Sequence, residues 1–387
     1  MKRLLLMFSA VMLTATMFAA DPNIYASGLK VESVNVVAKT ATISYYLNAD
    51  ATALEFQLIN SSNEVTTVAI TAAADLTKGS HTTTVALGDV AVDTYHWALK
   101  ATANANESFA KVFEHGTTLK RLFATVDNSP ESEYMGRIYM VNRADAASAT
   151  AYVIGRDLTD VANGLFGMSK LQSAGRPSID SEGYVWWADW GDSHGGLYVT
   201  NPATLTTTTF FDGNQASSGV WTNSSGVEMG SSAPGCHVYS SGSNTKVFMA
   251  NEDKGTTLVA NGYLVYNVGQ PDGSILRTWN SAPSQKVAAT NNDNGNFAIV
   301  GTSHGAFLSQ HRTAGNNNSS AYSLMFYDNS GTQQYNSGGD TYITSTLGSG
   351  LAVSKDETKL ILVSGGDILL YDIAWNGDVP TLTYNTT

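Results

Sequence analysis

One segment decides the fold: Ser178-Ile-Asp-Ser-Glu-Gly183-Tyr-Val-Trp-Trp-Ala-Asp189-Trp-Gly-Asp-Ser-His-Gly-Gly-Leu-Tyr-Val-Thr-Asn201. It predicts the end of a strand, a tight turn closing at Gly183, a second strand, a loop and a third strand. The run Val-Trp-Trp-Ala is apolar at every position, as expected of a strand that is buried on both faces. The segment is therefore one unit of a β architecture, and its outline recurs along the chain.

Five stretches match the strand that follows the turn. They are Gly136–Asn142, Gly183–Asp189, Thr245–Asn251, Gly295–Gly301 and Thr358–Ser364, and their first residues are 47 to 63 residues apart. A further strand is expected after each, at Ala151–Ile154, Gly196–Asn201, Tyr263–Asn267, Ser323–Asp328 and Asp367–Asp372. A strand is expected before the turn at Pro177–Ile179, Cys236–Tyr239, Lys286–Ala289 and Leu351–Ser354. Repeats of about 40–60 residues with four short strands each are typical of a β-propeller.

The repeats at Ser178–Trp186 and Val353–Asp372 resemble propeller repeats of the NHL and YVTN kind. The resemblance implies an all-β propeller over residues 119–387 and implies nothing specific about chemistry. Five blades are visible, and a sixth is open around Gly213–Pro234, so the prediction is five to seven. A single sheet leaves both faces in water, so such sheets must pack around a closed ring.

Residues 21–118 alternate apolar and polar side chains with a period of two. The pattern predicts short strands at Thr40–Leu47, Ala53–Ile59, Val65–Ile70, Thr82–Leu87 and Thr94–Ala101. Turn-forming residues separate them, which favours an antiparallel sandwich.

Four stretches of this part, Ile43–Asn48, Leu54–Val65, Leu76–His81 and Asp93–Ala101, carry a second resemblance. They resemble the immunoglobulin/fibronectin type III-like domain of the flagellar hook-cap family and of many secreted Bacteroidetes proteins. Such domains act as spacers and interaction modules, so the resemblance concerns the fold and not a reaction.

The N-terminus, Met1–Ala20, reads as a signal peptide. Lys2 and Arg3 precede the apolar run Leu4–Leu13, and the small residues Ala19-Ala20 end the segment. The alternative is a membrane anchor, but the run is shorter than the ~18 apolar residues that a span needs. We therefore expect a secreted protein, extracellular or at the cell surface, with the periplasm as an alternative and without membrane insertion after cleavage.

Composition limits the partners. Only 14% of the 387 residues are charged, the net charge is −12, and no cluster of basic residues occurs. Nucleic acid and anionic membrane surfaces are therefore unfavourable partners. Cys236 is the one cysteine, so neither an intrachain disulfide nor a cysteine-rich zinc site can form.

Two copies of the tripeptide Ser-His-Gly place His194 and His304 in expected loops between second and third strands. Two imidazoles on one rim of a propeller could bind a metal or transfer protons. The alternative is turn chemistry inherited by duplication, and two histidines without a third ligand leave the metal undecided. His311 and His237 are the available third groups.

A second candidate feature is aromatic. Trp190 and Asp192 lie in the same expected loop as His194, and an exposed Trp beside carboxylates suits a sugar ring. The alternative for the neighbouring Trp186 and Trp187 is blade packing. Asn291–Asn296 is rich in the oxygen ligands that calcium prefers, but it lacks the distant Glu and coincides with an expected turn, so no cofactor is expected.

No nucleophile elbow, phosphate-binding loop, dinucleotide fingerprint or zinc-protease motif occurs in the sequence. We therefore expect a non-catalytic binding or interaction protein whose propeller rim contacts a glycan or a surface protein. The candidate ligand-binding residues are Trp190, Asp192, His194, His304 and His311. The alternatives are an extracellular carbohydrate-active lyase or hydrolase that uses the rim histidines, and a structural repeat protein of the envelope.

Overall fold

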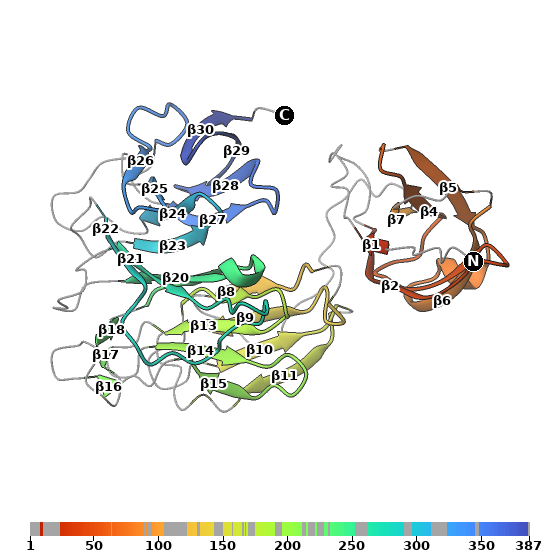
Figure 1. Ribbon diagram of the computed structural model, residues 1–387, viewed down its shortest axis with the longest axis horizontal. Coiled ribbons are helices and arrows are strands. Elements are labelled where there is room, and N and C mark those ends of the chain that lie inside the picture. The colour runs from red at the N-terminus through yellow and green to blue at the C-terminus, as the bar shows by residue number, and fades with distance from the viewer. Residues whose placement is uncertain are drawn as a thin grey trace. The chain divides into compact units, whose positions relative to one another are not determined.

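The computed structural model is almost entirely β-structure. It describes residues 8–10, 24–62, 64–88, 90, 95–103, 122–129, 132–142, 150–156, 158–164, 166, 168, 175–189, 196–210, 214–215, 221–222, 228–230, 233–251, 262–289, 296–310, 323–344 and 348–385. The chain divides into two compact units (Figure 1). The first comprises Met1–Thr117, Val126–Ile138 and Ile154–Asp160, and the second comprises Thr118–Thr125, Tyr139–Val153 and Val161–Thr387.

The first unit contains two sheets. One has the order β2-β3-β6 and the other the order β1-β7-β4-β5. The strands are β1 (Phe8–Ala10), β2 (Ala26–Asn35), β3 (Thr40–Leu47), β4 (Ala53–Ile59), β5 (Val65–Ile70), β6 (Gly79–Ala86) and β7 (Tyr95–Thr102), with the 3-10 turn η1 (Ala73–Leu76) before β6. All pairings are antiparallel except that of β1 with β7.

Alternation of side chains explains the core of this unit. Ala41, Ile43 and Leu47 of β3 are fully buried, and so are Phe56 and Leu58 of β4. Their side chains form one apolar cluster between the two sheets. The expected strands at residues 40–47, 53–59 and 65–70 have the expected bounds, whereas β2 was not among the predicted strands.

Among the described residues, the second unit contains five four-stranded antiparallel sheets and one three-stranded sheet. We number the four-stranded sheets one to five in chain order. The first sheet contains β8 (Leu122–Val126), β9 (Ile138–Asn142), β10 (Thr150–Ile154) and β11 (Asp160–Gly164), and the second contains β12 (Ser178–Ile179), β13 (Val185–Asp189), β14 (Gly196–Thr200) and β15 (Thr207–Thr209). The third contains β19 (Cys236–Tyr239), β20 (Lys246–Asn251), β21 (Gly262–Asn267) and β22 (Gln285–Ala288), and the fourth contains β23 (Asn296–Gly301), β24 (Gly305–Gln310), β25 (Leu324–Asp328) and β26 (Gln333–Asn336). The fifth contains β27 (Gly348–Val353), β28 (Lys359–Ser364), β29 (Asp367–Asn376) and β30 (Val379–Tyr384). In each of them, strands that follow one another in the chain lie side by side.

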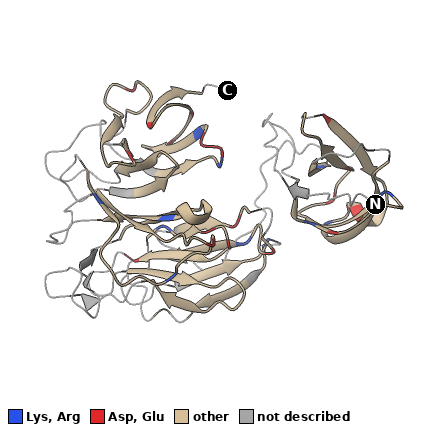
Figure 2. Cartoon of the chain, viewed as in Figure 1, with Lys and Arg blue, Asp and Glu red and all other residues tan. Residues whose placement is uncertain are grey.

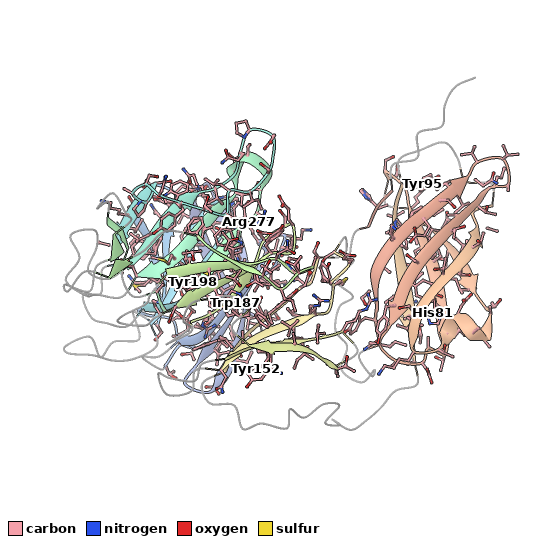
Figure 3. All side chains as sticks on the ribbon, turned by 90° about the horizontal axis from the view of Figure 1, so that it is seen from below. His81, Tyr95, Tyr152, Trp187, Tyr198 and Arg277 are labelled. Atoms are coloured by element: carbon pink, nitrogen blue, oxygen red, sulfur yellow. The ribbon has the colours of Figure 1, made fainter. Side chains whose placement is uncertain are left out.

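Successive sheets pack face to face, in the way that propeller blades pack. Trp187 of β13 faces the first sheet, and Trp186 of the same strand faces the third. Both indole rings are fully buried, which confirms that this strand is apolar on both faces because both are covered (Figure 3 labels Trp187). Apolar clusters likewise join the third sheet to the fourth and the fourth to the fifth.

Close packing also explains one glycine. Gly301 ends β23, and a Cβ atom there would lie 2.2 Å from the ring of Phe248 on β20. The backbone of the fourth sheet thus approaches the third sheet more closely than any side chain would allow.

The fourth repeat was predicted one strand out of register. The stretch Gly295–Gly301 contains β23, which is the first strand of its sheet and not the second. The stretch Lys286–Ala289, expected as the first strand of this repeat, overlaps β22, which pairs with β21 in the third sheet. The error arose because the turn between β23 and β24 has only three residues, so β24 was taken as part of a loop.

The stretch Gly213–Pro234, where a sixth blade was open, contains a small sheet of three short strands: β16 (Asn214–Gln215), β17 (Trp221–Thr222) and β18 (Glu228–Gly230). A second 3-10 turn, η2 (Gly242–Asn244), connects β19 to β20. Charged residues are sparse along the described part of the chain (Figure 2). None of the helical segments described is long and apolar enough to cross a membrane.

Candidate functional site

Four of the five predicted site residues lie outside the described residues. Trp190, Asp192 and His194 belong to the connection between β13 and β14, and His311 directly follows β24. His304 is described, and the candidate site is therefore built around it.

In the strand order, His304 and the connection that contains His194 take different places. Connections alternate between the two ends of an antiparallel sheet. The connections between the first and second strands and between the third and fourth strands lie at one end of each sheet, which we call the turn end. The connection between the second and third strands lies at the opposite end, which we call the loop end. His304 belongs to a first–second turn, between β23 and β24, and His194 to a second–third connection. The first strands of neighbouring sheets run in the same direction, as the parallel bridge between Arg176 and Gly235 shows.

The expected pairing of two imidazoles from the Ser-His-Gly tripeptides stays a prediction, because His194 lies outside the described residues. The sequence match followed the tripeptide, whereas the position within the sheet depends on the count of strands before it. His311 occupies the second–third connection of the fourth sheet, which is the counterpart of the connection that holds His194.

His304 is held on three sides by the fifth sheet. Its ring stacks on the indole of Trp375, with centroids 4.1 Å apart and an interplanar angle of 19°. Its Nδ1 lies 3.0 Å from Oδ1 of Asp378, and its Nε2 lies 3.9 Å from Oε2 of Glu357. Glu357 also accepts hydrogen bonds from the backbone N–H and the hydroxyl of Ser303, at 2.7 and 2.6 Å.

This arrangement does not form a metal site. The two carboxylates face opposite ring nitrogens, so they do not converge on a single point. No group of three His, Cys, Asp or Glu side chains that could hold a metal occurs within the described part of the chain. The geometry instead fixes a turn of the fourth sheet against two turns of the fifth.

At two other interfaces a polar contact likewise joins the first–second turn of one sheet to the third–fourth turn of the next. Asp180, in the first–second turn of the second sheet, pairs with Arg277 from the third–fourth connection of the third sheet. Lys246 begins the second strand of the third sheet, and its Nζ donates to Oδ1 of Asn329 in the third–fourth turn of the fourth sheet, at 3.0 Å. We call three contacts the polar keys: Asp180 with Arg277, Lys246 with Asn329, and His304 with Asp378. Each of them joins the turn end of one sheet to the turn end of the next.

The key between Asp180 and Arg277 is the most buried of the three. The Asp180 side chain is fully buried and that of Arg277 is 18% exposed (Figure 3 labels Arg277). Oδ2 of Asp180 accepts from Nη2 of Arg277 at 2.8 Å and from Nε1 of Trp186 at 3.0 Å. The guanidinium also lies 3.5 Å from the ring centre of Tyr184. Burial nonetheless raises the pKa of Asp180, with Arg277 and the hydrogen bonds opposing it, because desolvation penalises the charged carboxylate.

His237, the other possible third ligand, is committed to the backbone. It lies on β19, and its Nδ1 accepts the N–H of Gly301 on β23 at 3.1 Å. Burial lowers the pKa of this imidazole to about 4, so the ring is neutral at neutral pH. The adjacent Cys236 is buried, and burial raises the pKa of its thiol to about 12, which makes it a poor nucleophile.

A stacked pair of tyrosines, one exposed and one partly buried, lies at the loop end, and it was not among the predicted site residues. Tyr342, in the connection between β26 and β27, stacks on Tyr384 of β30 with centroids 3.8 Å apart and an interplanar angle of 17°. Tyr342 is 48% exposed. We call these two rings the tyrosine platform. The residues are 42 positions apart in the chain, so nothing in the local sequence pattern could have paired them.

Comparisons with known proteins give no family. No family model matches the chain, and no curated protein matches it. Similar solved structures include hydrazine synthase from Kuenenia stuttgartiensis, with 9% identity, coverage of 70% of this chain and 69% of that chain, and a TM-score of 0.43. TolB from Acinetobacter baumannii has 10% identity, coverage of 92% and 78%, and a TM-score of 0.40. The Dos1 propeller has 11% identity, coverage of 65% and 56%, and a TM-score of 0.37. These values are too low to assign a function, and the propeller-like architecture rests on the sheets themselves.

Proposed function

We propose that this chain is a secreted or cell-surface protein that binds a glycan or a surface protein and does not catalyse a reaction. The observation that carries the proposal is the tyrosine platform. Large aromatic rings held rigidly at a surface supply contact area at a low cost in conformational entropy, and they are enriched in binding sites.

The contacts of His304 argue against the alternative of a carbohydrate-active enzyme. Both ring nitrogens face carboxylates, and one ring face lies against Trp375. A general acid or base needs a nitrogen within hydrogen-bond reach of substrate, and here Nδ1 is occupied by Asp378 while Nε2 faces Glu357 at 3.9 Å, beyond hydrogen-bond distance.

The proposal includes an immunoglobulin/fibronectin type III-like first unit that presents the propeller. The sheet β2-β3-β6 has the order of strands A, B and E in such domains, and β7-β4-β5 has the order of F, C and C′. Export by the leader Met1–Ala20 would place both units outside the cytoplasm. This assignment concerns architecture alone, and we expect the ligand to bind at the rim of the propeller.

The experiment is a binding screen with the purified full chain. We expect saturable binding to members of a glycan array or to a surface protein, and no turnover of polysaccharides in the same buffer. A chain that degrades a polysaccharide, and loses this activity when His304 is changed to Ala, would favour the enzyme. A chain without binding or turnover would favour the structural envelope protein.

A further inference from the structure

We infer that the tyrosine platform is the binding site for one ring of a neutral glycan, with the sugar stacked on the exposed face of Tyr342. This inference rests on the proposed function and adds the residues and the ligand class. It starts from the way in which the protein holds an aromatic ring in water.

The ring of Tyr342 is fixed from below. One of its faces lies against Tyr384, and the Tyr384 ring meets the buried Tyr371 edge-on, with centroids 5.7 Å apart. Tyr371 belongs to the apolar core between the fourth and fifth sheets. The exposed ring therefore rests on a column of aromatic rings that begins in the core.

The backbone of Tyr342 is fixed as well. Oδ1 of Asp340 accepts the N–H of Tyr342 at 2.8 Å and the N–H of Ile343 at 3.2 Å. Ile343 is 1% exposed and anchors the segment in the core. A ring that is ordered before binding loses little entropy when a ligand arrives, which is the physical advantage of preorganisation.

The charge around the platform selects a neutral ligand. The carboxylate of Asp340 accepts from the hydroxyls of Tyr335 and Tyr371, in addition to the two backbone N–H groups. These donors are neutral, so they leave its negative charge in place. On a chain of net charge −12, this position disfavours acidic sugars and acidic peptides.

Polar groups at the edge of the platform suit a sugar. Within the described contacts, the hydroxyls of Tyr342 and Tyr384 have no protein partner, so both can bond a ligand. An apolar C–H face of a sugar ring stacks on an aromatic face while its hydroxyls bond such groups.

A peptide that adds a strand to the sheet is the competing ligand, and β30 is the edge strand it would use. Pro380 lies in that strand, and proline cannot donate a backbone hydrogen bond. Natural proteins use proline on edge strands to prevent such pairing. The observations therefore favour the sugar.

The test measures the affinity of the full chain for the neutral oligosaccharide that binds best on a glycan array, by calorimetric titration. We expect Tyr342→Ala to weaken binding by about tenfold or more, and Tyr342→Phe, which keeps the ring and loses the hydroxyl, by about two- to fivefold. The control is Tyr25→Ala, which removes a comparably exposed ring, 41% against 48%, from the first unit. Thermal unfolding of each variant checks that the fold is kept.

Each other result is decisive. Unchanged glycan affinity in Tyr342→Ala would overturn the site and leave the proposed function standing. Binding to a protein but to no neutral glycan would overturn the ligand class and also leave the function standing. Turnover of a polysaccharide without stable binding would overturn the proposed function, and the inference would fall with it.

Discussion

At the scale of single residues, two groups with catalytic chemistry, His304 and Asp180, hold neighbouring sheets together. His304 and Asp180 have the residue types of a catalytic site, yet each is bonded to the neighbouring sheet. Residue type alone could not reveal this, because the partners Asp378 and Arg277 are 74 and 97 positions away in the chain. A sequence can suggest which groups could react, but only the arrangement of strands shows whether they face a ligand.

The half-buried imidazole of His237 predicts how the free energy of unfolding depends on pH. Its pKa is about 4 in the folded protein and about 6.5 in an unfolded chain. Between these pH values the unfolded state binds more protons than the folded state. The contribution of His237 to the free energy of unfolding is therefore complete above about pH 6.5 and is lost as the pH falls towards 4. Because His237 is partly exposed, we expect a loss of about 1–2 kcal/mol in the free energy of unfolding between pH 7.5 and 5.

The matched variant is His237→Asn, whose side-chain oxygen can still accept the N–H of Gly301 but does not titrate. Urea unfolding at the two pH values should show a smaller loss for this variant than for the unmodified chain. Equal losses in both proteins would mean that His237 is protonated as easily in the folded state as in the unfolded one.

At the scale of elements, the sequence predicted strands well and their order less well. In the first unit the alternation of Thr40–Leu47 gave correct bounds, because one face of β3 is buried and the other is wet. In the fourth sheet both β23 and β24 carry apolar runs. The periodicity of the sequence therefore could not show which of them is the second strand of the sheet. The tyrosine platform was out of reach for a similar reason, since it joins a connection to a distant strand.

The key between Asp180 and Arg277 predicts a large effect of one substitution. Arg277→Ala would leave the buried carboxylate of Asp180 without its countercharge, and we expect a loss of about 3–5 kcal/mol in the free energy of unfolding. Arg277→Lys should recover part of it, because Lys keeps the charge but not the planar fork. Chemical denaturation of both variants measures the difference.

Lys246→Ala is the control for this prediction. Lys246 joins the same pair of turns one interface further on, through a neutral and more exposed partner, Asn329. We expect this variant to lose about 1 kcal/mol or less. A loss in Arg277→Ala as small as this would show that the buried ion pair contributes no more than a surface contact.

At the scale of the second unit, apolar side chains fill four interfaces between the five described four-stranded sheets, which leaves one outer face on the first sheet and one on the fifth. Leu360 and Leu362 of β28 pack against the fourth sheet, so only one face of this strand is buried. The other face of the same sheet carries Ile361, Val363, Ile368 and Leu370, which lie side by side in register. Ile361 is 42% and Ile368 is 74% exposed.

We expect another sheet to cover this face in solution, as sheets cover the equivalent faces elsewhere. In a closed ring the first sheet, β8 to β11, is the one available. If so, Ile368→Asp would bury a charge and reduce the free energy of unfolding by about 2–4 kcal/mol. The control is Val37→Asp in a turn of the first unit, where the side chain is 92% exposed and the change should stay within about 0.5 kcal/mol. Matching small effects would show that the ring stays open at this face.

The three polar keys have a consequence for how the chain finds its structure. Leu, Val, Phe and Tyr on one sheet could pack against almost any other sheet of this kind, so apolar contacts alone would tolerate neighbours in the wrong sequence. The keys are not interchangeable: guanidinium meets carboxylate, ammonium meets amide, and imidazole meets carboxylate. Exchanging two sheets would bring Asp180 opposite Asn329 or Asp378 and leave a buried anion unmatched. The polar contacts between turns thus specify which sheet packs beside which. A ring with its sheets in the wrong order would be less stable, because these contacts would not form.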